Sequence, residues 1–524
     1  MDLASLAALR TSLPGTRVAR LVAAAVGIHV LTAWFNGGYF HPDEHWQILE
    51  FAWYRLGHEP ASVLPWEFAA RIRPAFQPWM AAGLITALQR VGAFTPFLAA
   101  FLLRLASALL GLWVSLSLCA YVLPSIRRLA YRRMAFYGTL FLCTAPFLHA
   151  RFSAESWGGT LTFGGLLLLL AAGAACRGNG REPGTATPAG AVALAAGAGL
   201  AWGFAFFGRV QMTPAIAGAV LWWVLARRGS WRLIGVAAAG FAVALAANVA
   251  IDHWFYDAWL FTPFRYFDVN VFQGKASTWG TSPWWMVFVP FLLMALPPFS
   301  AVALALLIIG AWTCRRHVLV WMLVPFVAAH AVVPHKELRF MAPMIFAFAP
   351  LVALGFDALP ARLAAWLDAP RRAAFRAFAR WTFLVSNGVA LAIITFIPAL
   401  PTYPLIREAW EEGRAHPVRL LSFTQSLYAH QLSDANRMRF YQPDTVSEIM
   451  ARDVRDPAAA LSAPPGTRVL VFYAGVRPPA ALVASGITCV TRAASLSRDL
   501  RRLYGFEWIG DSHVWTLCEP ERGR

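Results

Sequence analysis

One short segment near the N-terminus concentrates side chains that can carry acid–base chemistry. Residues 37–50 read Gly-Gly-Tyr-Phe-His-Pro-Asp-Glu-His-Trp-Gln-Ile-Leu-Glu, so Asp43 and Glu44 stand between His41 and His45. A helix start would explain the proline and the two acids, because both favour the first helical turn. It does not explain the two histidines and the tryptophan. A carboxylate at the top of an apolar bundle can act as a general base toward a hydroxyl. We therefore expect Asp43, with Glu44 second, to be catalytic.

A second segment, Pro-His-Lys-Glu-Leu-Arg-Phe over residues 334–340, offers cations between two apolar runs. It could be an interfacial anchor whose long side chains reach lipid headgroups. Alternatively, Lys336 and Arg339 lie three apart, on one face if the segment is helical, and could hold a phosphate. The chain has only two lysines, and the other, Lys275, also lies in a candidate loop. We expect Lys336 and Arg339 to bind a phosphate, with Arg209 and Lys275 as further candidates.

Residues 252–283 are rich in aromatic side chains mixed with Asn, Asp and Arg. Such a segment can be an interfacial aromatic belt, or it can bind a sugar by ring packing and polar contacts. Arg151 and Glu155, four apart among apolar residues, could pair on a helix or serve a ligand. The candidates for substrate contacts are His41, His45, Trp46, Trp66, Arg73, Arg151, Glu155, Asn270, Trp279, His335 and Glu337.

The composition shows which elements must position these residues. Hydrophobic residues make up 58% of the 524 residues and charged residues 14%, about half the charged share of a soluble domain. The apolar residues form runs such as 97–123, 158–176, 189–207 and 284–312, long enough to span a bilayer. The sequence predicts an all-α polytopic membrane protein of about 11–13 transmembrane helices, with a long first outer loop at 36–78. A soluble enzyme, a fibrous protein and a disordered chain are excluded.

The net charge of +18 could suggest nucleic acid. The arginines, however, cluster between apolar runs, as at 127–133, 227–232 and 371–380. This distribution is the positive-inside pattern of membrane proteins, so we expect no nucleic-acid partner. The same rule places the N-terminus in the cytoplasm, with a retained first span, and residues 36–78 outside.

The character of the chain changes after residue 400. Val469–Tyr473 and Val514–Cys518 are typical of strands, and Arg498–Leu503 of a helix. We predict a transmembrane catalytic domain over residues 1–400 and a small soluble α/β domain over 401–524. Cys489 and Cys518 could form a disulfide there if the domain faces an oxidising compartment.

These motifs, in this order, resemble the α-mannosyltransferase family that builds GPI anchors and the N-glycan lipid precursor. The family's His/Asn-Pro-Asp-Glu-His element is similar to residues 41–45, and its His-Lys-Glu-x-Arg-Phe element to 335–340. Residues 66–68, 71–74 and 269–284 resemble its Trp-Glu-(Tyr/Phe), Arg-(Ser/Pro) and Phe-Asn-Val…Tyr-Gly-Thr-x-Pro-Trp elements. The chain departs from it at 151–155 and 209–211, where the family has Arg-Thr-x-Ser/Thr-Asn and Arg-Pro-Thr. These departures bear on the acceptor more than on the chemistry.

The resemblance implies the GT-C glycosyltransferase fold and an inverting transfer of mannose from a polyprenyl-phosphate-mannose donor to a glycolipid or lipid-linked glycan hydroxyl. Because built-in cations would neutralise the leaving phosphate, we expect no metal and no cofactor. Three alternatives remain: a GT-C transferase of another sugar, a lipid-linked-sugar flippase or transporter, and a non-catalytic subunit. The arginine- and alanine-rich composition favours a bacterial plasma membrane with the active site outside, rather than an endoplasmic reticulum.

Overall fold

The computed structural model describes residues 15–177, 188–430, 433–456, 459–484, 487–504 and 514–522. They form two compact units. The membrane unit comprises the described residues up to Trp34 together with Arg71–Gln77 and Leu103–Phe396. The loop unit comprises Phe35–Ala70, Pro78–Leu102 and the described residues from Ile397 onward.

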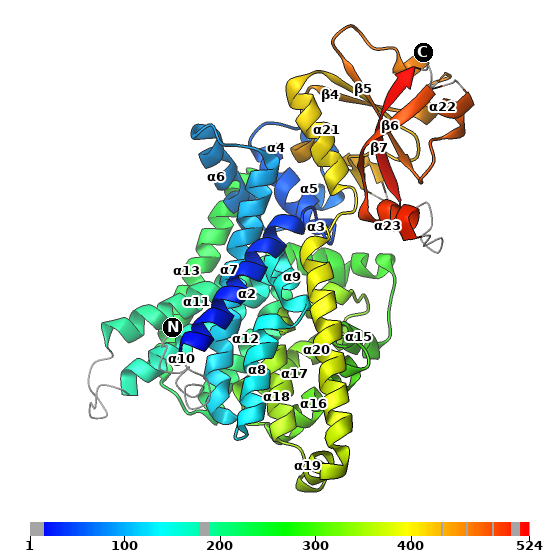
Figure 1. The fold of residues 1–524 in the computed structure, drawn as a ribbon. Helices are drawn as coiled ribbons and strands as arrows, with labels where there is room; N and C mark the ends of the chain where they lie inside the picture. Colours follow the sequence, from blue (N-terminus) through cyan, green and yellow to red (C-terminus); the bar gives the residue numbers. More distant parts are fainter. Residues whose placement is uncertain are drawn as a thin grey trace. The chain divides into compact units, whose positions relative to one another are not determined.

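The membrane unit is helical (Figure 1). Seven described helices, or helix combinations, are long and apolar enough to cross a membrane. They are α2 (Gly15–Phe35), α7 (Pro96–Val122) with a short 3-10 turn, α10 (Ala154–Arg177), α11 (Ala189–Gly208), α13 (Trp231–Tyr256), α18 (Ile345–Asp357) with the preceding η9 (Leu338–Met344), and α20 (Ala373–Phe396) with η10 (Pro370–Arg372). The chain is therefore a multi-pass membrane protein.

Several apolar runs form shorter helices than the sequence suggested. The mostly apolar residues 134–150 are divided between α8 (Leu129–Phe141) and α9 (Thr144–Ala150), and the apolar residues after His317 form only the 15-residue α17 (Val318–Val332). The run at 284–312 bends by 120° between Trp284–Met294 and Phe299–Thr313. With this pair counted as one span, the described residues hold up to eight candidates. Apolarity sets where helices can enter a membrane, but proline and loop geometry set how far each continues.

The remaining helical segments of this unit are short. They are η4 (Val210–Met212), α12 (Thr213–Leu221), η5 (Trp222–Ala226), α14 (Thr262–Phe267), η6 (Asp268–Phe272), η7 (Lys275–Trp279), η8 (Trp284–Phe288), α15 (Val289–Met294), α16 (Phe299–Thr313) and α19 (Ala361–Asp368).

Glycines allow α11 and α13 to lie side by side. A Cβ added at Gly199 on α11 would lie 1.8 Å from the Ala237 carbonyl oxygen, and one at Gly240 on α13 would lie 2.3 Å from the Ala196 oxygen. Membrane helices associate without a hydrophobic driving force, and small residues let their backbones approach closely and pack well. The end of α11 is thereby fixed, and Arg209 follows directly.

The loop unit joins the first outer loop to the C-terminal region. The loop contains α3 (Asp43–His45), η1 (Trp46–Glu50), α4 (Phe51–Arg55), η2 (Ala61–Val63) and α5 (Trp66–Ala70), and most of α6 (Phe76–Arg90) follows. Gly38, with φ of +79°, lies against Leu400, and the Gly37 carbonyl accepts the Ala399 N–H at 2.9 Å. Only glycine combines that backbone angle with that close approach.

The C-terminal region forms the predicted α/β domain. Its five-stranded sheet has the order β4-β1-β5-β7-β6, parallel from β4 to β5 and antiparallel at β7 and β6. The strands are β1 (Val418–Ser422), β4 (Val446–Met450), β5 (Arg468–Ala474), β6 (Ile487–Ala494) and β7 (Trp515–Arg522), and β2 (Ala429–His430) pairs with β3 (Ser433–Arg437). The helices are α21 (Tyr403–Ala415), α22 (Ala480–Ala484) and α23 (Leu496–Tyr504). The predicted strands and helix of this domain are confirmed.

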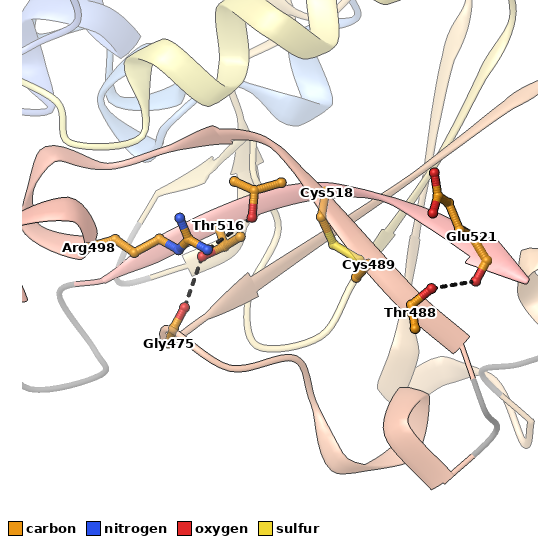
Figure 2. The surroundings of a disulfide bond; sticks show 8 residues. Gly475, Thr488, Cys489, Arg498, Thr516, Cys518 and Glu521 are labelled. Carbon is orange, nitrogen blue, oxygen red and sulfur yellow. Dashed lines mark hydrogen bonds between the residues drawn. A yellow bond between two sulfur atoms is a disulfide. The ribbon is translucent and has the colours of Figure 1, made fainter. Parts of the chain in front are cut away.

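A disulfide joins β6 and β7 (Figure 2). It connects Cys489 to Cys518, with the Cα atoms 5.7 Å apart, as the sequence suggested for an oxidising compartment. Thr488 donates to the Glu521 carbonyl at 3.1 Å on the same strand pair. The cross-link fixes the end of the chain to the edge of the sheet.

Candidate active-site clusters

The predicted catalytic motif begins a helix with a π turn. α3 continues through η1 into α4, so residues 43–55 are helical throughout, and the Trp46 N–H donates to the Pro42 carbonyl at 3.0 Å. π turns within helices occur frequently at functional sites. The first turn carries Asp43 and Glu44, both half-buried.

Asp43 and Glu44 have different surroundings. His41 Nδ1 accepts the Asp43 N–H at 3.2 Å and lies 3.5 Å from Asp43 Oδ1, with the two side chains 31% and 20% exposed. Glu44 Oε2 accepts the N–H of Phe40 at 3.2 Å, so this carboxylate binds the backbone of the residues that precede the helix. The His41 imidazole therefore fixes the backbone at the start of the helix beside the Asp43 carboxylate, and Asp43 remains the first candidate for the general base.

His45 and Trp46 point into the core of the loop unit. His45 Nε2 lies 2.5 Å from Glu50 Oε1, and the His45 ring stacks on Tyr441 at 5.4 Å between centroids. Burial lowers the pKa of His45 to about 3, so this imidazole is neutral. Trp46 is 4% exposed and meets the His45 ring edge-on. Both residues were predicted as substrate contacts; His45 instead holds the motif helix against the C-terminal region, and Trp46 packs on His45 and Tyr39.

The sequence assigned no role to a buried carboxyl pair beneath this motif. Glu50 and Glu59 are hydrogen-bonded to each other, and both Glu50 oxygens accept the Phe440 N–H, at 3.2 and 3.3 Å. Burial raises the pKa of Glu50 to about 8 and that of Glu59 to about 10, against the favourable charge of Arg439. Two adjacent buried carboxyls cannot both ionise, so the pair keeps at least one proton at neutral pH. In the sequence, the high density of acidic residues in this loop was the only feature that pointed to such a pair.

A hydrogen bond ties the second motif of the loop to the first. Gln47 Nε2 donates to Glu67 Oε1 at 3.0 Å, and both residues are buried. Trp66 precedes Glu67 at the start of α5 and is half-buried. Residues 41–50 and 66–68 therefore belong to one packed structure.

The membrane unit brings several predicted residues together in a buried ionic cluster. Glu155 Oε1 lies 3.1 Å from Arg209 Nη1 and 3.2 Å from Arg339 Nη1. The Glu155 and Arg209 side chains are each 5% exposed, and Arg339 is 11% exposed. One carboxylate oxygen thus bridges two guanidinium groups from distant parts of the sequence. Within the described part of the chain, Arg209 Nη2 has no hydrogen-bond partner.

The His335–Phe340 segment completes this cluster. Arg339 Nε donates to Glu337 Oε2 at 2.6 Å, and Glu337 Oε1 lies 3.1 Å from His335 Nε2. The Phe340 ring centroid lies 4.9 Å from the Arg209 guanidinium carbon, a cation–π distance. Glu337, a candidate for a substrate contact from the sequence, thus binds and orients Arg339.

Lys336 does not share a helical face with Arg339, as the spacing argument assumed. Lys336 lies in extended chain, and η9 starts only at Leu338. Its Nζ donates to the carbonyls of Val333 and Ser282, at 2.6 and 3.1 Å. The His335 imidazole also lies 2.9 Å from the Gly280 carbonyl. These contacts place Lys336 beside residues 280–282, which directly follow η7. Lys275 and Trp279 are the first and last residues of η7.

Arg73 and Asn270 meet at a tyrosine. The Arg73 guanidinium carbon lies 5.6 Å from the Tyr266 ring centroid, and Asn270 Nδ2 donates to the Tyr266 carbonyl at 3.0 Å. The Tyr266 hydroxyl accepts from Gln211 Nε2 at 2.7 Å. Buried Asp252, which sequence reasoning missed, accepts the Ala75 N–H at 2.8 Å and so fixes the chain after Arg73.

Arg151 and Trp279 show opposite exposure. Arg151 is 2% exposed in the break between α9 and α10, so it precedes the helix that carries Glu155. Arg151 and Glu155 therefore do not lie on one helix, as the suggested pairing assumed. Trp279 is 60% exposed. Among the residues that the structure describes, no group of three His, Cys, Asp or Glu side chains is arranged to hold a metal ion.

Comparison with known proteins defines the class. Residues 21–412 match the model of the Alg9-like mannosyltransferase family, and the chain therefore belongs to this family. It is 27% identical over 338 residues to GPI mannosyltransferase 3 of Yarrowia lipolytica, covering 63% of this chain and 60% of that protein. It is 32% identical over 123 residues to a probable Dol-P-Man:Man(7)GlcNAc(2)-PP-Dol alpha-1,6-mannosyltransferase of Schizosaccharomyces pombe, covering 24% and 22%. The matches span less than two thirds of either relative.

Among solved structures, the chain is similar to ArnT from Cupriavidus metallidurans bound to undecaprenyl phosphate. The TM-score is 0.48 at 12% identity, covering 97% of this chain and 98% of the other. The Archaeoglobus fulgidus oligosaccharyltransferase gives a TM-score of 0.45, also at 12% identity, covering 76% and 55%.

Proposed function

We propose that the protein is an inverting mannosyltransferase that uses a polyprenyl-phosphate-mannose donor and a glycolipid or lipid-linked glycan acceptor. Family membership supports mannose transfer, and the relatives named above include a GPI and a Dol-P-Man mannosyltransferase. The observation that carries the proposal is the buried Arg209–Arg339 pair with Glu155. Arg209 Nη2, buried at the end of α11 and without a hydrogen-bond partner among the described residues, is suited to an anionic oxygen.

In the proposed reaction, Asp43 takes the proton of the acceptor hydroxyl. The acceptor oxygen forms a bond to mannose C1 as the bond between C1 and the phosphate oxygen breaks, with inversion at C1. The lipid leaves as polyprenyl phosphate with one more negative charge. Arg209 and Arg339, with Lys336 and Lys275 as further cations, stabilise that charge. No metal ion or cofactor is assigned a role.

We further propose that the loop unit faces outward from a bacterial plasma membrane. The first outer loop and the C-terminal domain are parts of one compact unit, and the domain contains a disulfide, which is typical of oxidising compartments. The four free cysteines all lie in the membrane unit.

Purified wild type, Asp43→Asn and Glu44→Gln test the function. Each receives radiolabelled polyprenyl-phosphate-mannose, membrane lipid extract and EDTA. We expect Asp43→Asn to lose about 10²–10⁴-fold of the transfer rate, as for loss of a general base, and Glu44→Gln to retain most of it. Equal loss in both variants would remove the distinction between the acids. Labelled product from a polyprenyl-phosphate-glucose donor, but not from the mannose donor, would overturn the sugar assignment.

A further inference from the structure

Glu155 is an unusual residue for a phosphate site. A single carboxylate oxygen lies within 3.2 Å of both guanidinium groups that the proposed function assigns to the donor phosphate. An acid in the first turn of α10 interacts favourably with the helix dipole, but this interaction does not require burial of the side chain. Glu155 is 4% exposed, and burial of a carboxylate is costly unless cations compensate it.

The two arginines are held in place by other contacts. The Arg209 stem lies against α10 at Gly158, where an added Cβ would be 3.2 Å from Arg209 Cβ, and its guanidinium lies over Phe340. Arg339 is held by the two oxygens of Glu337, at 2.6 and 3.3 Å. Displacement of the Glu155 carboxylate would therefore leave both guanidinium groups oriented.

The position between the two guanidiniums already holds an anion. A phosphate oxygen and a carboxylate oxygen require the same donors in the same geometry, so both cannot take this position at once. Resting on the proposed function, we propose that the Glu155 carboxylate occupies the place that the lipid phosphate takes between Arg209 and Arg339. It thereby competes with the phosphate and limits retention of the lipid phosphate product.

The competition has a kinetic consequence. The product monoester carries more negative charge than the donor diester, so cations without a counter-anion would hold the product more strongly than the donor. A carboxylate that returns to the arginines after transfer favours product release, which often limits turnover. Glu155 is then a positioning residue that sets the affinity of the site for lipid phosphate.

Direct binding tests this inference on the full chain in detergent micelles. Dissociation constants for undecaprenyl phosphate are measured by intrinsic tryptophan fluorescence, with neutral undecaprenol as the reference ligand. We expect Glu155→Gln to bind undecaprenyl phosphate about tenfold or more tightly than wild type, since a buried charge beside the phosphate is removed. Binding of undecaprenol should not change. In turnover, Glu155→Gln should lower both KM for the donor and kcat, with stronger inhibition by added undecaprenyl phosphate.

Glu337→Gln is the matched control, because it removes the same charge from the same cluster, but Glu337 contacts Arg339 and His335 and does not bridge the two arginines as Glu155 does. We expect it to tighten binding by less than about threefold. Equal tightening in both variants, or no tightening in Glu155→Gln, would overturn the inference while leaving the phosphate site intact. Failure of the wild type to prefer undecaprenyl phosphate over undecaprenol would overturn the site and the inference together.

Glu155→Asp serves if the glutamine variant does not fold. It keeps the charge but is one methylene shorter, so it cannot reach both guanidiniums equally. We expect Glu155→Asp to bind undecaprenyl phosphate more tightly than wild type, but by less than about tenfold. Affinity at or below the wild-type value in Glu155→Asp would contradict displacement of the carboxylate.

Discussion

The two units bury acidic side chains in opposite ways. In the membrane unit, Glu155 is ionically paired with two arginines, and in the loop unit, Glu50 and Glu59 face each other and retain a proton. In the membrane unit the arginines keep their positive charge and can therefore attract an anionic ligand. In the loop unit the protonated pair carries less charge and forms a hydrogen-bonded support for the helix that carries Asp43 and Glu44. Burial alone thus does not reveal what a carboxylate does; its neighbours decide.

The largest effect is expected from breaking the ionic cluster. Arg209→Gln removes one of the guanidinium groups that contact Glu155 and should lower the free energy of unfolding by about 3–5 kcal/mol, the usual loss when one partner of a buried pair is removed. Unfolding of the purified protein in detergent measures it. Double replacement by Arg209→Gln and Glu155→Gln should recover part of the loss. No recovery would show that Arg209 stabilises the fold through packing and not through charge.

The disulfide tests whether stability in the loop unit is separate from that in the membrane unit. Cys489 and Cys518 are 29 residues apart, and a loop of that length predicts a loss of about 3–4 kcal/mol in the double serine variant. Limited proteolysis should show faster cleavage of the sheet domain with unchanged protection of α10 and α11. Equal loss of protection in both units would mean that they unfold together.

The carboxyl pair should make the loop unit sensitive to alkaline pH. In the folded protein the pKa values of Glu50 and Glu59 are raised to about 8 and about 10, against 4.5 for an ordinary glutamate. The folded state therefore binds more protons than the unfolded state above pH 4.5. Stability from this pair is fully present below that pH and falls as pH rises toward 8, by about 1.4 kcal/mol per pH unit for one group. Unfolding midpoints of the sheet domain between pH 5 and pH 8 measure the slope.

The smallest effect is expected from removing the titrating group without changing its shape. Glu59→Gln keeps a donor for Glu50 and should change stability at pH 5 by only about 1 kcal/mol. The variant should flatten the pH dependence, since Glu50 then ionises without a carboxylate neighbour. A slope identical to that of the wild type would assign the alkaline sensitivity to another part of the molecule.

Local patterns in the sequence were enough for the class of protein and for many elements. Continuous apolar runs with basic flanks predicted a helical membrane protein, and the strand-like residues at 469–473 and 514–518 predicted two strands of the sheet. The motifs of residues 41–45 and 335–340 identified the family that the comparison confirmed. These patterns involve residues that are close together in the chain, so they can be read from a single sequence.

Only the tertiary structure decided which charged residues meet. Arg209 has no acid near it in the sequence, yet its partner is Glu155, because close packing of α10, α11 and η9 brings them together. Lys336 and Arg339 were expected on one helical face, but the helix begins between them. The sequence determined the apolar runs, the motifs and the side chains able to carry charge. Whether each buried acid is paired with a cation or keeps a proton depends on long-range contacts, which local spacing does not encode.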